Sequence, residues 1–188
     1  MLGLNPPPTD PRWLNVAKQN LEEILTDHAY CEQKPASTAI SLIIGFPRNS
    51  ELVSAMTDLA QEEMSHFKMV HDLILERGYT LGIERKDEYV LQLLTFLPKG
   101  GSREAQLTHR LLCAALIEAR SCERFRILSE ELEDRKLMIS EANHYTLFLK
   151  LARKYGPSKE TVDQKWQSLL DYEATVIRKL GDKESIHG

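Results

Sequence analysis

Two Glu-x-x-His pairs, Glu63 with His66 and Glu141 with His144, are the residues of this sequence whose types and spacing could do chemistry. Side chains three residues apart on an α-helix are neighbours, with Cβ atoms about 5–6 Å apart. One carboxylate and one imidazole can therefore reach the same metal ion. A single pair of this kind in a charged helix is common and usually has no such role. Here both pairs interrupt apolar helical stripes, and this favours a metal site.

Two lone glutamates complete the ligand set. Glu32 and Glu118 each stand on the apolar stripe of a separate helical segment. Two lone glutamates and two Glu-x-x-His pairs, one group per helix, are typical of bundles that bind two metal ions. The four carboxylates would neutralise two divalent ions, and their burial without metal would be costly. Carboxylates and imidazoles without thiolates favour iron or manganese over structural zinc. The predicted ligands of two iron ions are Glu32, Glu63, His66, Glu118, Glu141 and His144.

Two assignments around these ligands stay open. Glu123 competes with Glu118, because it lies about 140° away around the helix and also has apolar neighbours. His28 lies one turn before Glu32, where it either donates a hydrogen bond to that ligand or is merely a packed histidine. The remaining histidines have no such context and are expected to be surface or structural residues: His71, His109 and His187.

The elements that must position these residues are all helical, since no alternating strand pattern of useful length occurs. Apolar residues at helical spacing predict helices over residues 13–44, 50–77, 89–96, 103–131, 135–155 and 158–181. Gly78 and Gly156 are natural helix stops, and Ser102 is a natural helix cap. Pro35 lies inside the first helix and removes one backbone hydrogen bond, so a kink or bulge is expected there.

The order of these helices predicts the fold. Two long helices, a long crossover from Gly78 to Gly101 and two more helices have ferritin-like connectivity. We therefore expect an all-α, ferritin-like four-helix bundle with an extra C-terminal helix over 158–181. It should form a single di-iron domain over residues 1–188, in which residues 1–11 are an extended segment.

The two predicted halves of the bundle are unequal. Glu118 and Glu141 are closer in sequence than Glu32 and Glu63. Either the second half is shorter, or Glu123 replaces Glu118 as the ligand, or a stretch near position 134 is missing from the chain. The last interpretation is favoured, because the sequence there has no clean turn signal.

The composition is that of an ordinary soluble globular chain of 188 residues, with 42% hydrophobic and 28% charged residues. No apolar run approaches the roughly 18–20 residues of a membrane helix, and the proline-rich N-terminus does not look like a signal peptide. Three cysteines without a Cys-x-x-Cys motif indicate free thiols, as expected of a cytoplasmic protein. The net charge of −4 means that binding to nucleic acid would need a local basic patch.

Four segments around the predicted ligands resemble one family of enzymes. They closely resemble the MiaE-type tRNA hydroxylases, which act on 2-methylthio-isopentenyl-adenosine, and the resemblance extends from about Leu4 to Arg178. Pro35 and the short interval before the last ligand pair depart from the family pattern, but neither removes a ligand. The segments are CEQKPAST around Glu32, QEEMSHF around Glu63 and His66, ALIEARSCERF around Glu118, and SEANHYTLFLKLARKYG around Glu141 and His144.

The resemblance implies a reaction and partners that composition and spacing do not show. It implies hydroxylation of a methyl group on the isopentenyl tail of that adenosine, which lies beside the anticodon of certain bacterial tRNAs, with O2 and two electrons. A separate reductase would supply the electrons, because no flavin, haem or iron–sulfur motif is visible. The alternative is another ferritin-like di-iron activity: ferroxidase, iron storage or peroxide reduction. A non-enzymatic helical protein would bind no metal.

Two expectations concern the substrate. A dry pocket for the isopentenyl tail would be lined by the helix face that carries Glu118, with Leu111, Ala115, Cys122 and Phe125. Phosphate contacts would come from basic residues, although solvated helix charge is their usual role. The main candidates are Arg85, Lys86, Arg103, Arg110, Arg120, Arg124 and Arg126, with Arg120 and Arg124 the favoured pair, and a second group is Lys150, Arg153 and Lys154.

Overall fold

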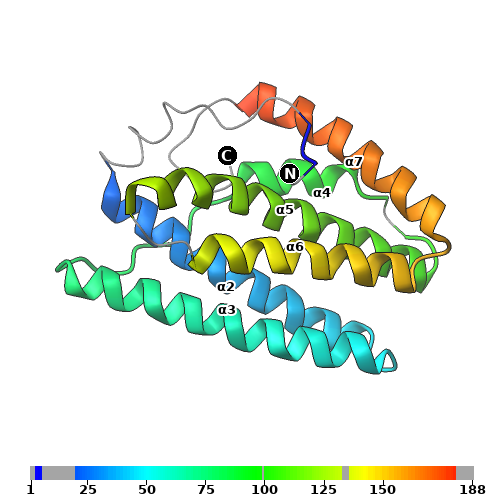
Figure 1. Ribbon diagram of the computed structural model, residues 1–188, viewed down its shortest axis with the longest axis horizontal. Coiled ribbons are helices and arrows are strands. Elements are labelled where there is room, and N and C mark those ends of the chain that lie inside the picture. The colour runs from blue at the N-terminus through cyan, green and yellow to red at the C-terminus, as the bar shows by residue number, and fades with distance from the viewer. Residues whose placement is uncertain (1–2, 6–19, 99, 133–135, 181–188) are drawn as a thin grey trace. The chain divides into compact units, whose positions relative to one another are not determined.

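A computed structural model of the chain describes residues 3–5, 20–98, 100–132 and 136–180. For Phe125 and residues 127–132 and 136–141 it describes the backbone only. The described residues form helices and no strand. The helices are α2 (Leu21–Gly45), α3 (Ser50–Glu76), α4 (Glu88–Phe96), α5 (Arg103–Leu132), α6 (Lys136–Tyr155) and α7 (Lys159–Leu180). Figure 1 shows them along the chain.

The helix bounds lie within one or two residues of the predicted ones wherever the structure describes them. α2 continues through Pro35 without interruption. The beginning of the first predicted helix, the extended segment at 1–11 beyond residues 3–5, and the turn near position 134 lie outside the described residues. None of the described helices is long and apolar enough to cross a membrane.

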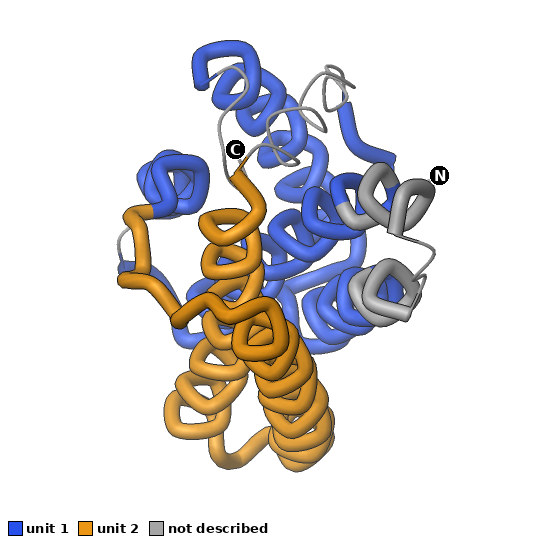
Figure 2. The backbone as a smooth tube through the Cα atoms, turned by 90° about the vertical axis from the view of Figure 1, so that its left-hand side faces the viewer, with its two compact units in different colours: residues 1–14, 87–183, 187–188 blue, residues 15–86, 184–186 orange. Residues whose placement is uncertain are grey.

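The chain divides into two compact units, which Figure 2 shows in different colours. One unit contains α2, α3 and the segment that follows them up to Lys86. Its two helices lie side by side, joined by a short turn. Leu25 and Ala29 of α2 are buried against Val70 and Ile74 of α3. The pairing places residues 32 and 63 on the facing sides of the two helices.

The other unit contains α4, α5, α6 and α7, and its loops are built for sharp turns. Asp87, Ser102 and Ser158 each accept a hydrogen bond from a main-chain N–H in the first turn of the helix that they precede. Gly156 follows the end of α6 where space is tight, since a Cβ there would clash with a methyl group of Val162. These caps and this close approach set where α5 and α7 begin, and α5 carries Glu118.

A buried ion network joins three helices of this second unit. It consists of Tyr89 of α4, Arg120 and Glu123 of α5, and Glu173 of α7. The Arg120 guanidinium donates to Glu173 Oε1 from Nε at 2.9 Å and from Nη2 at 2.6 Å, and Nη1 donates to Glu123 Oε2 at 2.6 Å. The Tyr89 hydroxyl donates to the same Glu173 oxygen at 3.2 Å. Arg120, Tyr89 and Glu173 are at most 1% exposed, so the network lies in the core.

Candidate metal centre

The α2–α3 unit brings three of the six predicted ligands together. Glu32 of α2, Glu63 of α3 and His66 of α3 each offer one ligand atom within 4.8 Å of the others. Glu32 Oε2 lies 3.3 Å from His66 Nδ1, and that nitrogen lies 4.0 Å from Glu63 Oε2. Glu32 is 1% exposed and Glu63 is fully buried. Two carboxylates and an imidazole on facing sides of two helices are therefore arranged as metal ligands would be.

His28 holds one oxygen of Glu32 in place. Its Nε2–H donates to Glu32 Oε1 at 2.9 Å from one helical turn away, and both side chains are buried. The other oxygen, Oε2, points toward His66 Nδ1 and accepts no hydrogen bond from the residues that the structure describes. One oxygen of Glu32 is thus anchored by protein, while the other faces the remaining ligands.

The surroundings of Glu32 keep it ionised. Burial by itself raises the pKa of the carboxyl, but the hydrogen bond and charge of His28, together with the nearby His66, outweigh it, so the pKa lies well below its usual range. A metal ligand must be deprotonated. Glu32 is therefore in the chemical form that binds a cation.

The second unit places Glu118 and His144 together. Glu118 of α5 and His144 of α6 are 2% and 3% exposed, and each offers one ligand atom within 4.8 Å of the other. Glu141 lies on α6, three residues before His144, and its side chain is outside the described residues. This unit therefore holds a second carboxylate–histidine pair in the expected helices.

The competing ligand Glu123 has a different role in the structure. Its carboxylate is 2.6 Å from Arg120 in the buried ion network. The arrangement favours Glu118 as the ligand and Glu123 as a partner of arginine, an assignment that the sequence left open.

The donor atoms in each unit fit a hard or borderline divalent cation. They are carboxylate oxygens and imidazole nitrogens, and no cysteine belongs to either group. Buried carboxylates without a cation would be costly, which agrees with a metal-binding role for both groups. The structure describes the side chains of five of the six predicted ligands. These five form carboxylate–histidine groups that are suited to metal.

The structure corrects the predicted phosphate contacts of Arg120 and Arg124. They are 1% and 3% exposed, and Arg120 is held by Glu173 and Glu123. A buried guanidinium cannot meet the phosphates of an RNA. Two other predicted residues form exposed ion pairs, Arg85 with Glu23 and Arg153 with Asp163.

Other predicted residues take structural positions. Leu111 and Ala115 are fully buried and Cys122 is 5% exposed. Burial raises the pKa of the Cys122 thiol, and burial raises that of Cys113 to about 12. His71 stacks on Phe67. The side chain of Phe125, and His187 as a whole, lie outside the described residues.

Comparison with known proteins finds one family along nearly the whole chain. Residues 4–188 match a family model described as MiaE, tRNA-(MS[2]IO[6]A)-hydroxylase. A Pseudomonas putida protein named tRNA 2-(methylsulfanyl)-N(6)-isopentenyladenosine(37) hydroxylase is 37% identical over 79% of this chain and 75% of its own. A Salmonella typhimurium protein of the same name is 26% identical over 90% of this chain and 82% of its own.

A solved structure confirms the predicted fold class. A Synechococcus protein with aldehyde deformylating oxygenase activity matches 96% of this chain and 94% of its own length, with a TM-score of 0.85 and 30% identity. The chain has the all-α, ferritin-like fold.

Proposed function

The chain belongs to the MiaE family of tRNA hydroxylases, and from that premise we propose that it hydroxylates the isopentenyl group of 2-methylthio-isopentenyl-adenosine in tRNA with a di-iron centre and O2. The reaction class agrees with its relatives, which are named for this substrate. The observation that carries the proposal is the group of Glu32, Glu63 and His66, with both carboxylates buried, in a chain whose match to the family model is nearly complete.

The residues that would hold the two irons are Glu32, Glu63, His66, Glu118, Glu141 and His144. When bound, the irons supply the oxidising power that inserts one oxygen atom of O2 into a C–H bond. One atom of O2 becomes the hydroxyl group, and the other leaves as water with two electrons and two protons from outside the chain.

The protein's own side chains orient the proposed ligands, supply negative charge and exclude water. His28 anchors Glu32 Oε1, so that Oε2 keeps one direction. Buried carboxylates provide the negative charge that retains divalent cations. Glu63, Glu118 and His144 are buried, so bulk water would be excluded around the residues that would hold the irons.

Electrons and substrate come from other molecules. We propose a separate reductase as the electron donor, and the anticodon loop of tRNA as the bound substrate. The reaction would take place in the cytoplasm, which fits the three buried free cysteines.

A reconstitution experiment tests the proposal. The purified chain is loaded with Fe²⁺ without oxygen, and iron is counted per chain. It is then given reductant, O2 and tRNA that lacks the hydroxyl group, and the tRNA nucleosides are analysed. We expect about two irons per chain and hydroxylated nucleoside. Iron oxidation without any modified nucleoside would instead indicate a ferroxidase or storage protein, and one zinc per chain would reject the di-iron site.

A further inference from the structure

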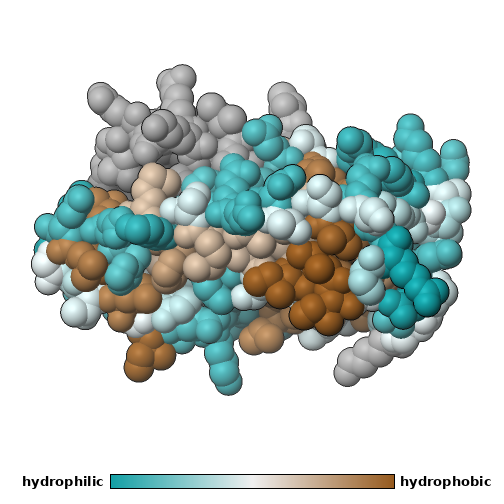
Figure 3. Space-filling view, turned by 90° about the horizontal axis from the view of Figure 1, so that it is seen from below, coloured by the Kyte–Doolittle hydropathy of each residue, from teal (hydrophilic) through white to brown (hydrophobic). Residues whose placement is uncertain are grey.

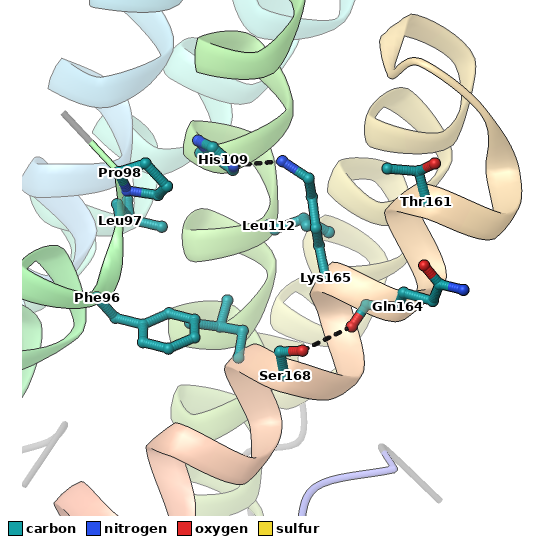
Figure 4. Close-up of a pocket in the computed structure, with 10 residues that line it drawn as sticks. Phe96, Leu97, Pro98, His109, Leu112, Thr161, Gln164, Lys165 and Ser168 are labelled. Carbon is teal, nitrogen blue, oxygen red and sulfur yellow. Dashed lines mark hydrogen bonds between the residues drawn. The ribbon is translucent and has the colours of Figure 1, made fainter. Parts of the chain in front are cut away.

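A pocket of about 400 Å³ lies within the second unit, between the end of α4, α5 and α7. Figure 4 shows the side chains that surround it. We call it the Lys165 pocket, because Lys165 is the one lysine among the described residues that line it. His109 lies on α5 nine residues before Glu118, which corresponds to about 14 Å along the helix axis and half a turn around it, so the two side chains leave opposite sides of the helix. The pocket is therefore separate from the proposed metal ligands of this unit.

One wall of the Lys165 pocket is polar. Thr161, Gln164, Lys165 and Ser168 follow one face of α7 at helical spacing. The Lys165 Nζ lies 2.6 Å from Nε2 of His109 across the pocket, and the dashed line in Figure 4 marks this contact. The ammonium donates and the imidazole accepts. Burial, and then the charge of Lys165, lower the pKa of His109, so the histidine stays neutral and the pair keeps one positive charge.

The rest of the pocket lining is apolar and partly aromatic. It consists of Phe96, Leu97, Pro98, Leu112 and Leu169. The Phe96 ring stacks on Tyr172 with centroids 4.6 Å apart and an angle of 15° between the ring planes. The Tyr172 hydroxyl donates to the main-chain oxygen of Gln92 at 3.2 Å, which fixes this aromatic pair. Phe96 is 40% exposed, so it remains accessible to a ligand.

The charges around the pocket select the kind of ligand. None of the described residues that line it is a carboxylate, and Lys165 is its cation. The chain as a whole carries −4, so an anion gains attraction only where a local positive charge stands free of acidic neighbours. A ligand with a flat apolar part and a negatively charged part fits both parts of the lining.

We propose that the Lys165 pocket binds a second nucleotide of the RNA substrate, an unpaired nucleotide other than the modified adenosine. Its base lies against Phe96 and Leu112, and its phosphate meets Lys165. Unpaired bases are recognised by stacking on aromatic side chains, and cations hold their phosphates. The inference rests on the proposed function, because it assumes that RNA is the substrate.

Three variants and one control test the Lys165 pocket. Lys165→Gln removes the charge, Phe96→Leu removes the aromatic ring, and Lys165→Arg restores a cation. The matched control is Lys159→Gln, because Lys159 is an exposed lysine on another face of the same helix and does not line the pocket. The probe is an anticodon stem–loop RNA that contains 2-methylthio-isopentenyl-adenosine. Affinity is measured over a range of salt concentrations, together with KM, kcat, iron content and Tm.

We expect substitutions of the lysine and of the aromatic ring to change RNA binding in different ways. Lys165→Gln should weaken RNA binding about tenfold, raise KM with little change in kcat, and reduce the slope of log affinity against log salt by about 0.7, the value for one lost phosphate contact on a single strand. Lys165→Arg should recover that slope. Phe96→Leu should weaken binding roughly fivefold or more, as expected for one stacked base, and leave the slope unchanged. Lys159→Gln should match the unmodified protein, and iron content should be the same in all four.

Several outcomes overturn the proposal. Equal losses for Lys165→Gln and Lys159→Gln would show a diffuse attraction to RNA, and unchanged KM in both pocket variants would show that RNA docks elsewhere. Binding of adenosine monophosphate that Lys165→Gln abolishes, without any effect on the RNA, would assign the pocket to a small metabolite. If the unmodified protein hydroxylates the RNA and the pocket variants bind and hydroxylate it equally well, the pocket inference alone fails. If the unmodified protein neither binds nor hydroxylates the RNA, the proposed function fails with it.

Discussion

Glu32 has two carboxylate oxygens with different surroundings. One is held by His28 at 2.9 Å, and the other faces His66 at 3.3 Å. A hydrogen bond to the carboxylate oxygen that does not face the metal fixes the orientation of a ligand and tunes its basicity. Loss of such a hydrogen bond typically lowers metal affinity by about 10–100-fold. His28 is therefore a positioning residue for the proposed centre.

Replacing His28 should weaken iron binding without destroying the fold. We expect His28→Ala to lower iron affinity by about 10–100-fold in competition with a chelator, because Glu32 loses its anchor. His71→Ala is the control, since His71 stacks on Phe67 in the same unit and does not contact Glu32. Equal iron affinity in the two variants would rule out the positioning role.

Replacing each of the two candidate glutamates of α5 should have a different effect on iron content and stability. Glu118→Ala should lose iron, because it removes a buried ligand beside His144. Glu123→Ala should keep its iron but melt at a lower temperature, because Arg120 loses one of its two carboxylate partners. Iron content and thermal melting measure both effects, and loss of iron in Glu123→Ala alone would move the ligand to position 123.

The burial of the proposed ligands could be predicted from the sequence better than the burial of the basic residues. Glu32, Glu63, Glu118 and His144 are buried because each interrupts an apolar stripe, and that pattern is visible in the chain. The burial of Arg120 depends on Glu173, which is 53 residues away. Nothing local marks such a partner, so an arginine on a core face looked like one on a solvated face. The Lys165 pocket was missed for the same reason, since three separate segments form it.

The helices themselves were largely predictable from local chemistry. Gly78 has a φ of 75°, which ends α3 at the expected place, and Ser102 caps α5. What local chemistry does not show is how α4, α5 and α7 are tied together by the buried ion network. A buried charge that loses one partner costs about 3–5 kcal/mol, whereas an exposed pair is worth about 0–1 kcal/mol.

Breaking the buried network should cost far more than breaking an exposed ion pair. We expect Glu173→Gln to lower the free energy of unfolding by about 3–5 kcal/mol, because Arg120 keeps its charge in the core with one carboxylate fewer. Arg153→Met is the control, because Arg153 and Asp163 are each 40% exposed, and it should cost about 0–1 kcal/mol. Denaturant unfolding of both variants measures the difference. Similar costs would mean that the network contributes no more than a surface pair.

Across the whole molecule, each compact unit carries its own carboxylate–histidine group. That division was not apparent in the sequence, which we interpreted as a single domain. In the proposed di-iron centre, metal binding and folding stability are linked, because a ligand that binds only the folded state stabilises it. The α2–α3 unit also exposes large apolar side chains, among them Ile40, Ile44 and Met64. Figure 3 shows that apolar side chains gather on one face of the molecule.

Metal removal should lower stability most at neutral pH. We expect the metal-free protein to melt below the iron-loaded protein at pH 7, and the difference to shrink in acid as protons displace the metal from its ligands. In the metal-free protein the pKa of Glu32 is below its unfolded value of 4.5. Its stabilising contribution is therefore present above that pH and is lost as the pH falls toward the folded pKa. Identical melting curves with and without iron at pH 7 would argue against a buried centre.

The buried thiols have a consequence for the proposed oxygen chemistry. A thiol reacts with oxidants and alkylating agents as the thiolate, and burial keeps Cys113 and Cys122 protonated. Peroxide that escapes during futile turnover would therefore find little thiolate to oxidise. We expect iodoacetamide to leave all three cysteines of the folded protein unmodified for as long as it stays folded, and to label them after denaturation, as mass spectrometry would show. The working lifetime of this catalyst would then be limited by the rate at which it unfolds, not by self-inflicted oxidation of its sulfur atoms.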